Sequence, residues 1–254
     1  MDLLEPTNER RHPWELRRAA FFASVLRTAL AGRMRYDVLD CGAGDAYFAS
    51  TLRDAVPGVR SITCYDANYD AATLLRLGGL YPSLAFSRSR PTQKFDVILM
   101  LDVLEHVDDD VSFLGEIVRE CAAEDALFLI SVPAWPVLFT RHDDFLGHRR
   151  RYKPGAADRV LEAAGLEIVK RGGAFHSLIA PRAATAAREK LAALRSPLPP
   201  LAESTASWNH GKAVTRLVTG ALHVDNFASR IFARAKITMP GLTYWALARR
   251  KTRA

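Results

Sequence analysis

Residues 36–45 read YDVLDCGAGD, an apolar run that ends in an acidic residue and a glycine-rich turn. The run has the length of a buried strand, and a helical pattern follows the turn. Glycine at 42 and 44 lets the backbone approach a ligand closely where the strand meets the helix. This arrangement is typical of a nucleotide-type cofactor site at the carboxyl edge of a sheet.

A second acidic residue stands in a comparable position. The strand pattern at residues 60–65 ends in Asp66, which follows Gly44 by 22 residues. A carboxylate at that strand end can accept hydrogen bonds from both hydroxyl groups of a ribose. The alternative interpretation is that Asp40 and Asp66 only cap the helices that follow them.

The third motif, KFDVILMLDVLEHV at residues 94–107, is a buried strand that turns acidic and then enters a helix. Together the three motifs make the chain resemble the class I S-adenosylmethionine-dependent methyltransferases over roughly residues 12–180. Ala46 stands where that family often has a third glycine. The segment at residues 83–89 lacks the carboxylate that frequently meets the adenine amino group in the family.

The resemblance implies S-adenosyl-L-methionine as the cofactor. In the family, the glycine turn lies under the methionine part of this molecule, the acid after the second strand holds the ribose, and the LEH segment closes the site. Carried over to this chain, the expected cofactor-binding residues are Asp40, Gly42, Gly44, Asp45, Asp66, Ala67, Asp102 and Glu105.

Length and patterning predict one α/β domain. A chain of 254 residues with 49% hydrophobic residues can bury a full core without dividing. Strand patterns alternate with helical ones, which predicts a seven-stranded, Rossmann-like, doubly wound sheet. The last strand resembles the antiparallel final strand of the family, and a helical insertion precedes it. The expected strands lie at residues 36–40, 60–65, 83–87, 95–101, 125–132, 166–171 and 242–249.

We divide this single methyltransferase domain, residues 1–254, into four parts. Residues 1–32 are expected to form an N-terminal helical cover over the cofactor cleft, and residues 33–174 the cofactor-binding core. The stretch at residues 175–240 is too long for a hairpin connection and is interpreted as a helical insertion that covers the substrate. Residues 241–254 form the final strand and a basic tail.

Cysteine usage and the N-terminus suggest a compartment. Cys41, Cys64 and Cys121 are odd in number and lack metal-ligand spacing, so we expect neither a disulfide nor a metal site. The N-terminus carries charged residues before any apolar run, and no stretch reaches transmembrane length. The expected localisation is therefore cytoplasmic.

Positive charge gathers in most of the insertion and in the tail. Residues 181–254 hold 13 Lys and Arg against 3 Asp and Glu, although the whole chain carries only +7. Such a region can contact an anionic membrane, a phosphorylated substrate or nucleic acid. Equally, the basic residues can solvate the outer face of a helix that packs on the core. No stacking aromatic residues interleave with them, so a nucleic-acid partner is not expected.

The segment RHDDFLGHRRRY at residues 141–152 follows the fifth strand, where an acceptor should arrive. Similar family members, some of them acting on lipid-linked or sugar-derived acceptors, carry a comparable GHxRRY segment. A neutral imidazole at His148 or His142 can remove a proton from an acceptor. The expected substrate-binding residues are Arg149, Arg150 and Tyr152.

Both histidine and arginine assignments have structural alternatives. The arginines and Tyr152 can instead tie the loop to the sheet as partners of Asp143 and Asp144. His106 can face the transferred methyl group as a third candidate base, or it can hydrogen-bond its neighbours as a core histidine.

The sequence therefore predicts a methyltransferase that acts on an O, N or C nucleophile of a small-molecule or lipid-linked acceptor. Peripheral contact with an anionic membrane is part of this hypothesis. Two alternatives stay open. One is a membrane or anionic-ligand binding protein that keeps the fold without the reaction, and the other is a nicotinamide-dependent oxidoreductase.

Overall fold

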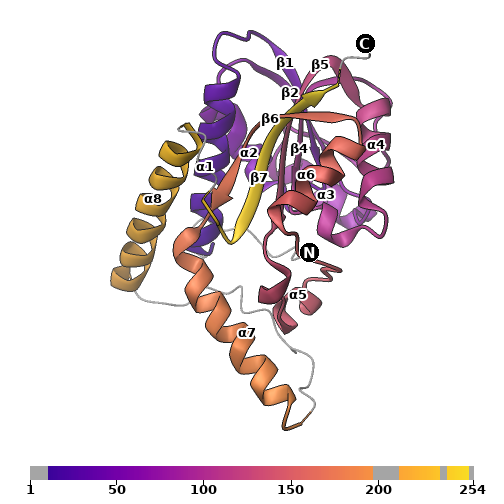
Figure 1. Ribbon diagram of the computed structural model, residues 1–254. Coiled ribbons are helices and arrows are strands. Elements are labelled where there is room, and N and C mark those ends of the chain that lie inside the picture. Colours follow the sequence, from indigo (N-terminus) through magenta and orange to yellow (C-terminus); the bar gives the residue numbers. More distant parts are fainter. Residues whose placement is uncertain (1–10, 197–211, 235–238, 252–254) are drawn as a thin grey trace.

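The computed structural model describes residues 11–196, 212–234 and 239–251 (Figure 1). Within them, seven strands form one sheet in the order β3-β2-β1-β4-β5-β7-β6. β7 runs antiparallel to its neighbours β5 and β6, and the other pairs are parallel. The strands are β1 Tyr36–Cys41, β2 Val59–Tyr65, β3 Ala85–Ser87, β4 Phe95–Leu101, β5 Ala122–Pro133, β6 Leu166–Ala174 and β7 Thr243–Arg250.

This sheet confirms the predicted α/β architecture with its antiparallel last strand. The main difference lies in β5, which begins at Ala122 rather than at residue 125. Parts of the predicted N-terminal cover, insertion and basic tail, at residues 1–10, 197–211, 235–238 and 252–254, lie outside the described residues.

Helices cover both faces of the sheet (Figure 1). The α-helices are α1 Pro13–Ala29, α2 Tyr47–Ala55, α3 Ala71–Leu80, α4 Asp110–Glu120, α5 Arg141–Phe145, α6 Pro154–Ala163, α7 Ile179–Ala193 and α8 Lys212–Arg234. Three 3-10 turns are η1 Leu104–His106, η2 Pro136–Leu138 and η3 His176–Leu178. Apolar residues of α1, α2 and α8 share one buried cluster, and those of α4 and α6 share a second.

The central strands supply alternate side chains to the two clusters. In β4, Val97 and Leu99 pack with α1 and α2, whereas Ile98 and Met100 pack with α4 and α6. Successive side chains of a strand point to opposite faces, so a strand covered on both faces must be apolar throughout. This is why β4 and β5 read as continuous apolar runs.

The expected helical insertion contains α7 and α8, and α8 packs on the protein with a face that carries polar side chains. Asp225, Asn226 and Ser229 are buried. Asp225 accepts hydrogen bonds from the backbone N–H groups of His176 and Ser177, at 3.1 and 3.0 Å. Asn226 donates to the carbonyl of Arg17 at 2.9 Å, which fixes α8 against α1. Polar side chains therefore hold α8 in place.

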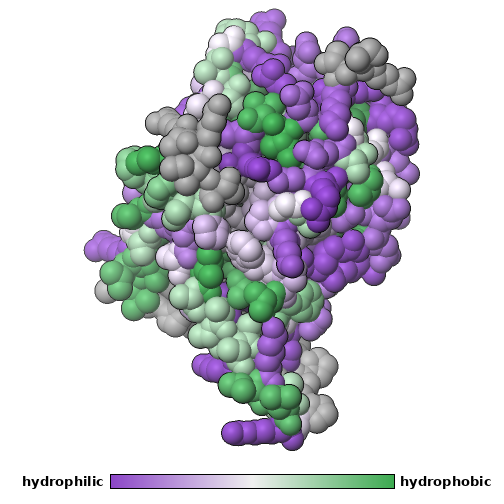
Figure 2. All heavy atoms as spheres, viewed as in Figure 1, coloured by the Kyte–Doolittle hydropathy of each residue, from purple (hydrophilic) through white to green (hydrophobic). Residues whose placement is uncertain are grey.

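The opposite face of α8 is apolar and exposed. Leu217, Val224 and Ile231 recur every seven residues, Phe227 lies beside them, and their exposed fractions range from 47% to 75%. Residues at this spacing share one face of a helix. Apolar surface accordingly gathers over α8 and along α7 (Figure 2).

Candidate functional site

The glycine turn between β1 and α2 has the backbone conformation that its sequence predicts. Gly42 and Gly44 have φ values of 75° and 55°, a left-handed region that side chains disfavour. A Cβ atom on Gly42 would lie 2.6 Å from Cγ2 of Val103, so only glycine fits there. Ala46 also adopts a left-handed φ of 59°, a conformation that favours glycine.

Asp66 supports the turn from the end of β2. Its carboxylate accepts hydrogen bonds from the N–H groups of Gly44, at 3.1 Å, and Asn68, at 2.9 Å. Each carboxylate oxygen has two lone-pair sites, so Asp66 can accept further bonds from a ligand. Ala67 follows it in the chain and is exposed.

Asp40 is a buried carboxylate at the end of β1. Burial raises its pKa to about 7, with further contributions from the negative charges of Asp66 and Asp45, while Arg18 opposes the shift. The carboxylates at this edge therefore repel one another. A positively charged ligand would relieve that repulsion.

Two arginines of the N-terminal segment reach the same edge of the sheet. Arg18 pairs with Asp102 at 2.7 Å, and the hydroxyl of Ser131 donates to the other oxygen of Asp102 at 2.9 Å. Arg11 pairs with Asp45, and its guanidinium stacks over the ring of Tyr47 at 3.9 Å from the centroid. Sequence analysis placed a helical cover here but did not identify these ion pairs.

Glu105 lies in η1, directly after β4, and its side chain is fully buried. Among the described residues, neither of its carboxylate oxygens has a hydrogen-bond partner. Burial, followed by the charge of Asp102, raises its pKa well above the usual value. The Nε2 atom of His148 lies 4.0 Å from Oε1 of Glu105. The ring of His106 meets that of His148 edge to face, with 4.8 Å between centroids.

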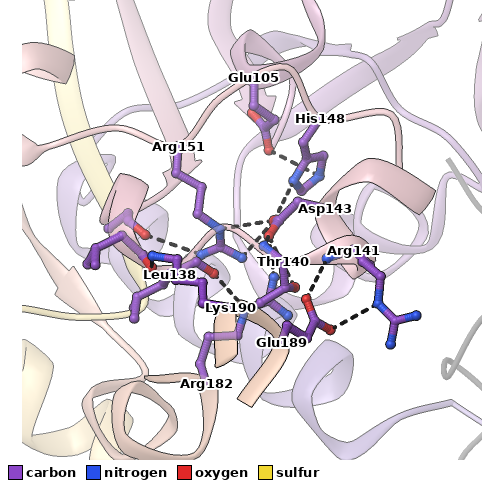
Figure 3. A network of polar contacts seen from close by, with 12 residues as sticks. Glu105, Leu138, Thr140, Arg141, Asp143, His148, Arg151, Arg182, Glu189 and Lys190 are labelled. Carbon is purple, nitrogen blue, oxygen red and sulfur yellow. Dashed lines mark hydrogen bonds and ion pairs between the residues drawn. The ribbon is translucent and has the colours of Figure 1, made fainter. Parts of the chain in front are cut away.

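Asp143 is the centre of a buried polar network (Figure 3). Its carboxylate accepts from Nδ1 of His148 at 3.0 Å, from Nε of Arg151 at 3.0 Å and from the N–H of Thr140 at 2.8 Å, and it also pairs with Arg182. Burial alone would raise the pKa of Asp143. The hydrogen bonds from His148 and Arg151 and the charges of the two arginines outweigh burial and hold it well below the usual value.

This network determines the proton position on His148. An ionised carboxylate only accepts hydrogen bonds, so Nδ1 of His148 must carry the proton that it donates to Asp143. In the neutral ring, Nε2 then presents a lone pair on the side of Glu105. His148 therefore has the geometry of a base that a buried carboxylate orients.

His142 is the third histidine that sequence analysis proposed as a base. It lies in α5, half-buried, and burial together with the neighbouring Arg182 lowers its pKa. Unlike His106, it does not belong to the group of side chains that converge on Glu105. We therefore give His142 less weight than His148.

The predicted substrate-binding side chains are largely engaged with the protein. Nε of Arg149 donates to the carbonyl of His106 at 2.8 Å, and Arg150 donates to the carbonyls of Val107 and Asp108 at 2.9 and 2.8 Å. The hydroxyl of Tyr152 donates to Asp110 at 2.6 Å. These bonds tie the segment after α5 to the turn after β4, which favours the structural alternative for Arg149, Arg150 and Tyr152.

Comparison with known proteins points to one family. A family model described as a methyltransferase domain matches residues 14–171. A probable S-adenosylmethionine-dependent methyltransferase of Mycolicibacterium smegmatis is 29% identical over 154 residues. The match covers 58% of this chain and 56% of the relative, so the chain spans only about half of that protein's length.

Solved structures share the fold at low sequence identity. The 1,6-didemethyltoxoflavin-N1-methyltransferase of Burkholderia thailandensis, bound to 1,6-didemethyltoxoflavin and S-adenosylhomocysteine, superposes with a TM-score of 0.52 and 17% identity. The match covers 94% of this chain and 81% of the Burkholderia chain. An S-adenosylmethionine-dependent methyltransferase of Mesorhizobium loti gives a TM-score of 0.53 and 14% identity, over 89% of this chain and 96% of its own.

Proposed function

Since the chain belongs to the methyltransferase-domain family, we propose that it transfers a methyl group from S-adenosylmethionine to an acceptor bound beside Glu105 and His148. The family match disfavours both alternatives that the sequence left open. The observation that carries the proposal is the group of carboxylates, Asp40, Asp66 and Asp102, around a glycine turn at the ends of β1, β2 and β4.

The residues at this edge fit the cofactor. Gly42 and Gly44 keep the turn free of side chains, and Asp66 retains lone pairs for the ribose hydroxyls. S-adenosylmethionine supplies an electrophilic methyl group on a positively charged sulfur. Burial raises the pKa of Asp40, and the negative charges of Asp66 and Asp45 add to the shift, so this edge of the sheet is complementary to a cation.

The protein's own part in the reaction is to orient the acceptor, exclude water and accept a proton. Methyl transfer is an in-line displacement, so alignment of the acceptor atom contributes most to the rate. When that atom must lose a proton, Nε2 of His148 is placed to take it, and Asp143 holds the ring in the required tautomer. The insertion, residues 175–240, is proposed as the cover on the substrate side.

We expect His148→Ala to lower turnover by about 100- to 1,000-fold, the usual effect of losing a general base. The affinity for S-adenosylhomocysteine should stay unchanged, because His148 contacts Asp143 and Glu105 rather than the glycine turn. Turnover is measured as transfer of a labelled methyl group to cell extract, and affinity by calorimetry. His223→Ala, an exposed histidine on α8, is the control. Equal turnover in the two variants would remove His148 from the mechanism.

We further propose that the acceptor is a small or lipid-linked molecule that the enzyme meets at an anionic membrane surface. The support is the exposed apolar face of α8, formed by Leu217, Val224, Phe227 and Ile231. This helix belongs to residues 181–254, which hold 13 Lys and Arg against 3 Asp and Glu. Apolar side chains with surrounding positive charge suit such a surface. Among the described residues, no helix has the length and hydropathy to cross a membrane.

In a flotation assay, we expect the protein to float with vesicles rich in phosphatidylserine. The bound fraction should be smaller at high salt. Leu217→Gln combined with Phe227→Gln should reduce the bound fraction about tenfold, because the variant loses apolar surface that the membrane buries. Leu75→Gln removes an equally exposed apolar residue from α3 and serves as the control. If both variants float like the unmodified protein, α8 does not contact the membrane.

A further inference from the structure

Glu105, His106 and His148 converge at the acceptor side of the candidate site, and we propose that they bind a divalent transition-metal ion. One ligand atom from each side chain lies within 4.8 Å of the other two. Ligands of a tetrahedral zinc ion with bonds of about 2.1 Å lie roughly 3.4 Å apart. The observed spacing therefore needs only a small closure of three side chains around an ion.

The state of Glu105 is the first argument for an ion. A fully buried carboxylate without a hydrogen-bond partner is costly, and such a group calls for an additional ligand. The nearby arginines do not fill this role, because Arg18 pairs with Asp102 and Arg151 pairs with Asp143. Glu105 is thus a buried carboxyl group without a hydrogen-bond partner, and the neighbouring arginines pair with other carboxylates.

The orientation of the two histidines is the second, independent argument. Nδ1 of His148 faces the carboxylate of Asp143 at 3.0 Å, and Nδ1 of His106 faces the carbonyl of Gly147 at 3.2 Å. Both partners are acceptors, so each neutral ring carries its proton on Nδ1 and a lone pair on Nε2. Metal-binding histidines use this same pattern, in which a carboxylate or carbonyl fixes the far nitrogen. Figure 3 shows it for His148 and Asp143.

The ligand set indicates the class of metal. Two imidazoles and one carboxylate suit zinc, manganese, iron or cobalt, whereas calcium and magnesium prefer oxygen ligands throughout. Three protein ligands leave coordination positions open for the acceptor. A hydroxyl group bound there would lose its proton to water more readily, since a divalent ion lowers the pKa of a coordinated oxygen. With the ion present, His148 acts as a ligand instead of a base.

Sequence analysis predicted no metal site, because the cysteines lack ligand spacing. Glu105 and His106 lie in η1, and His148 lies in the loop after α5, 43 residues after Glu105. A short sequence motif does not reveal such a site, because its ligands lie on two segments that only the fold brings together.

The inference deepens the proposed function, but the test is independent of methyl transfer. The full chain is stripped with a chelator and titrated with zinc chloride by calorimetry, and cobalt chloride is followed by its visible absorption. We expect one equivalent to bind, and we expect Glu105→Gln and His148→Ala each to weaken zinc binding about 100-fold. His223→Ala removes an exposed histidine elsewhere and should bind zinc like the unmodified protein.

Two controls keep the outcomes distinct. Glu105→Gln keeps the shape of the buried side chain and adds no charge, so the variant should keep the fold of the unmodified protein, and circular dichroism checks this. Binding of less than one equivalent by the unmodified protein, or zinc binding by the Glu105 and His148 variants that is as tight as that of the unmodified protein, would overturn the metal site. If the unmodified protein does not bind S-adenosylhomocysteine, the proposed function is wrong, whatever the result for zinc.

Discussion

Replacing Asp143 by alanine is expected to lower the melting temperature by about 10 °C. Asp143 neutralises Arg151 and Arg182, orients His148 and caps α5 through the N–H of Thr140. Removing one partner of a buried ion pair costs about 3–5 kcal/mol, because the remaining charge stays buried. In a protein of this size each kcal/mol corresponds to roughly 2–4 °C.

Thermal unfolding followed by circular dichroism measures this effect, and Asp144→Ala is the matched control. Asp144 is the next residue of the same helix, but it is exposed, so its loss should change little. The pKa of Asp143 is lowered in the folded state, so its stabilisation is present above the unfolded value near 4 and is lost as the pH falls below it. The difference between the Asp143 variant and the unmodified protein should therefore narrow in acid. Equal melting temperatures for the two alanine variants at pH 7 would contradict the network.

Asp66→Ala and Asp40→Asn are each expected to weaken binding of S-adenosylhomocysteine by about 100-fold. A hydrogen bond to a charged group contributes roughly 1.5–3 kcal/mol, and 1.4 kcal/mol corresponds to a factor of ten. Calorimetry on both variants measures the affinity. Asp54→Asn, an exposed position on α2, is the control. Unchanged affinity in both Asp40 and Asp66 variants would end the assignment of the cofactor site.

Asp40→Asn should also stabilise the protein without cofactor at pH 8. The folded protein holds the pKa of Asp40 near 7, above its ordinary value, so the folded state binds more protons between about pH 4 and pH 7. The contribution of Asp40 to stability therefore falls as the pH rises through this window. Asparagine carries no charge, so the variant should melt a few degrees higher at pH 8, and the difference should shrink as the pH falls toward 4. If Asp40→Asn weakens cofactor binding but raises the melting temperature, then Asp40 contributes to binding and lowers the stability of the fold.

Much of the fold could be predicted because its signals are local. The apolar runs of β1, β4 and β5 are continuous, and Gly42 and Gly44 mark the turn that requires a left-handed backbone. The antiparallel direction of β7 came from resemblance alone. Its own sequence shows a buried strand but carries no sign of its neighbours.

The candidate site could be predicted by region but not by contact. The LEH segment was identified, yet the approach of His148 to Glu105 depends on how two distant loops pack. Similarly, the pairing of Arg18 with Asp102 joins residues that are 84 positions apart. For α8 the sequence indicated a helix within the insertion but not which of its faces packs on the protein. That choice depends on Asp225, which satisfies the backbone of η3.

The position of β7 has a consequence for how the protein reaches its native state. This strand is translated after the other six, but it belongs between β5 and β6, in the interior of the sheet. Until it leaves the ribosome, the apolar strand β5 has an unpaired edge and β6 has no neighbouring strand, so both can pair with other chains. We therefore expect nascent chains that end before residue 243 to depend on chaperones and to aggregate when these are depleted.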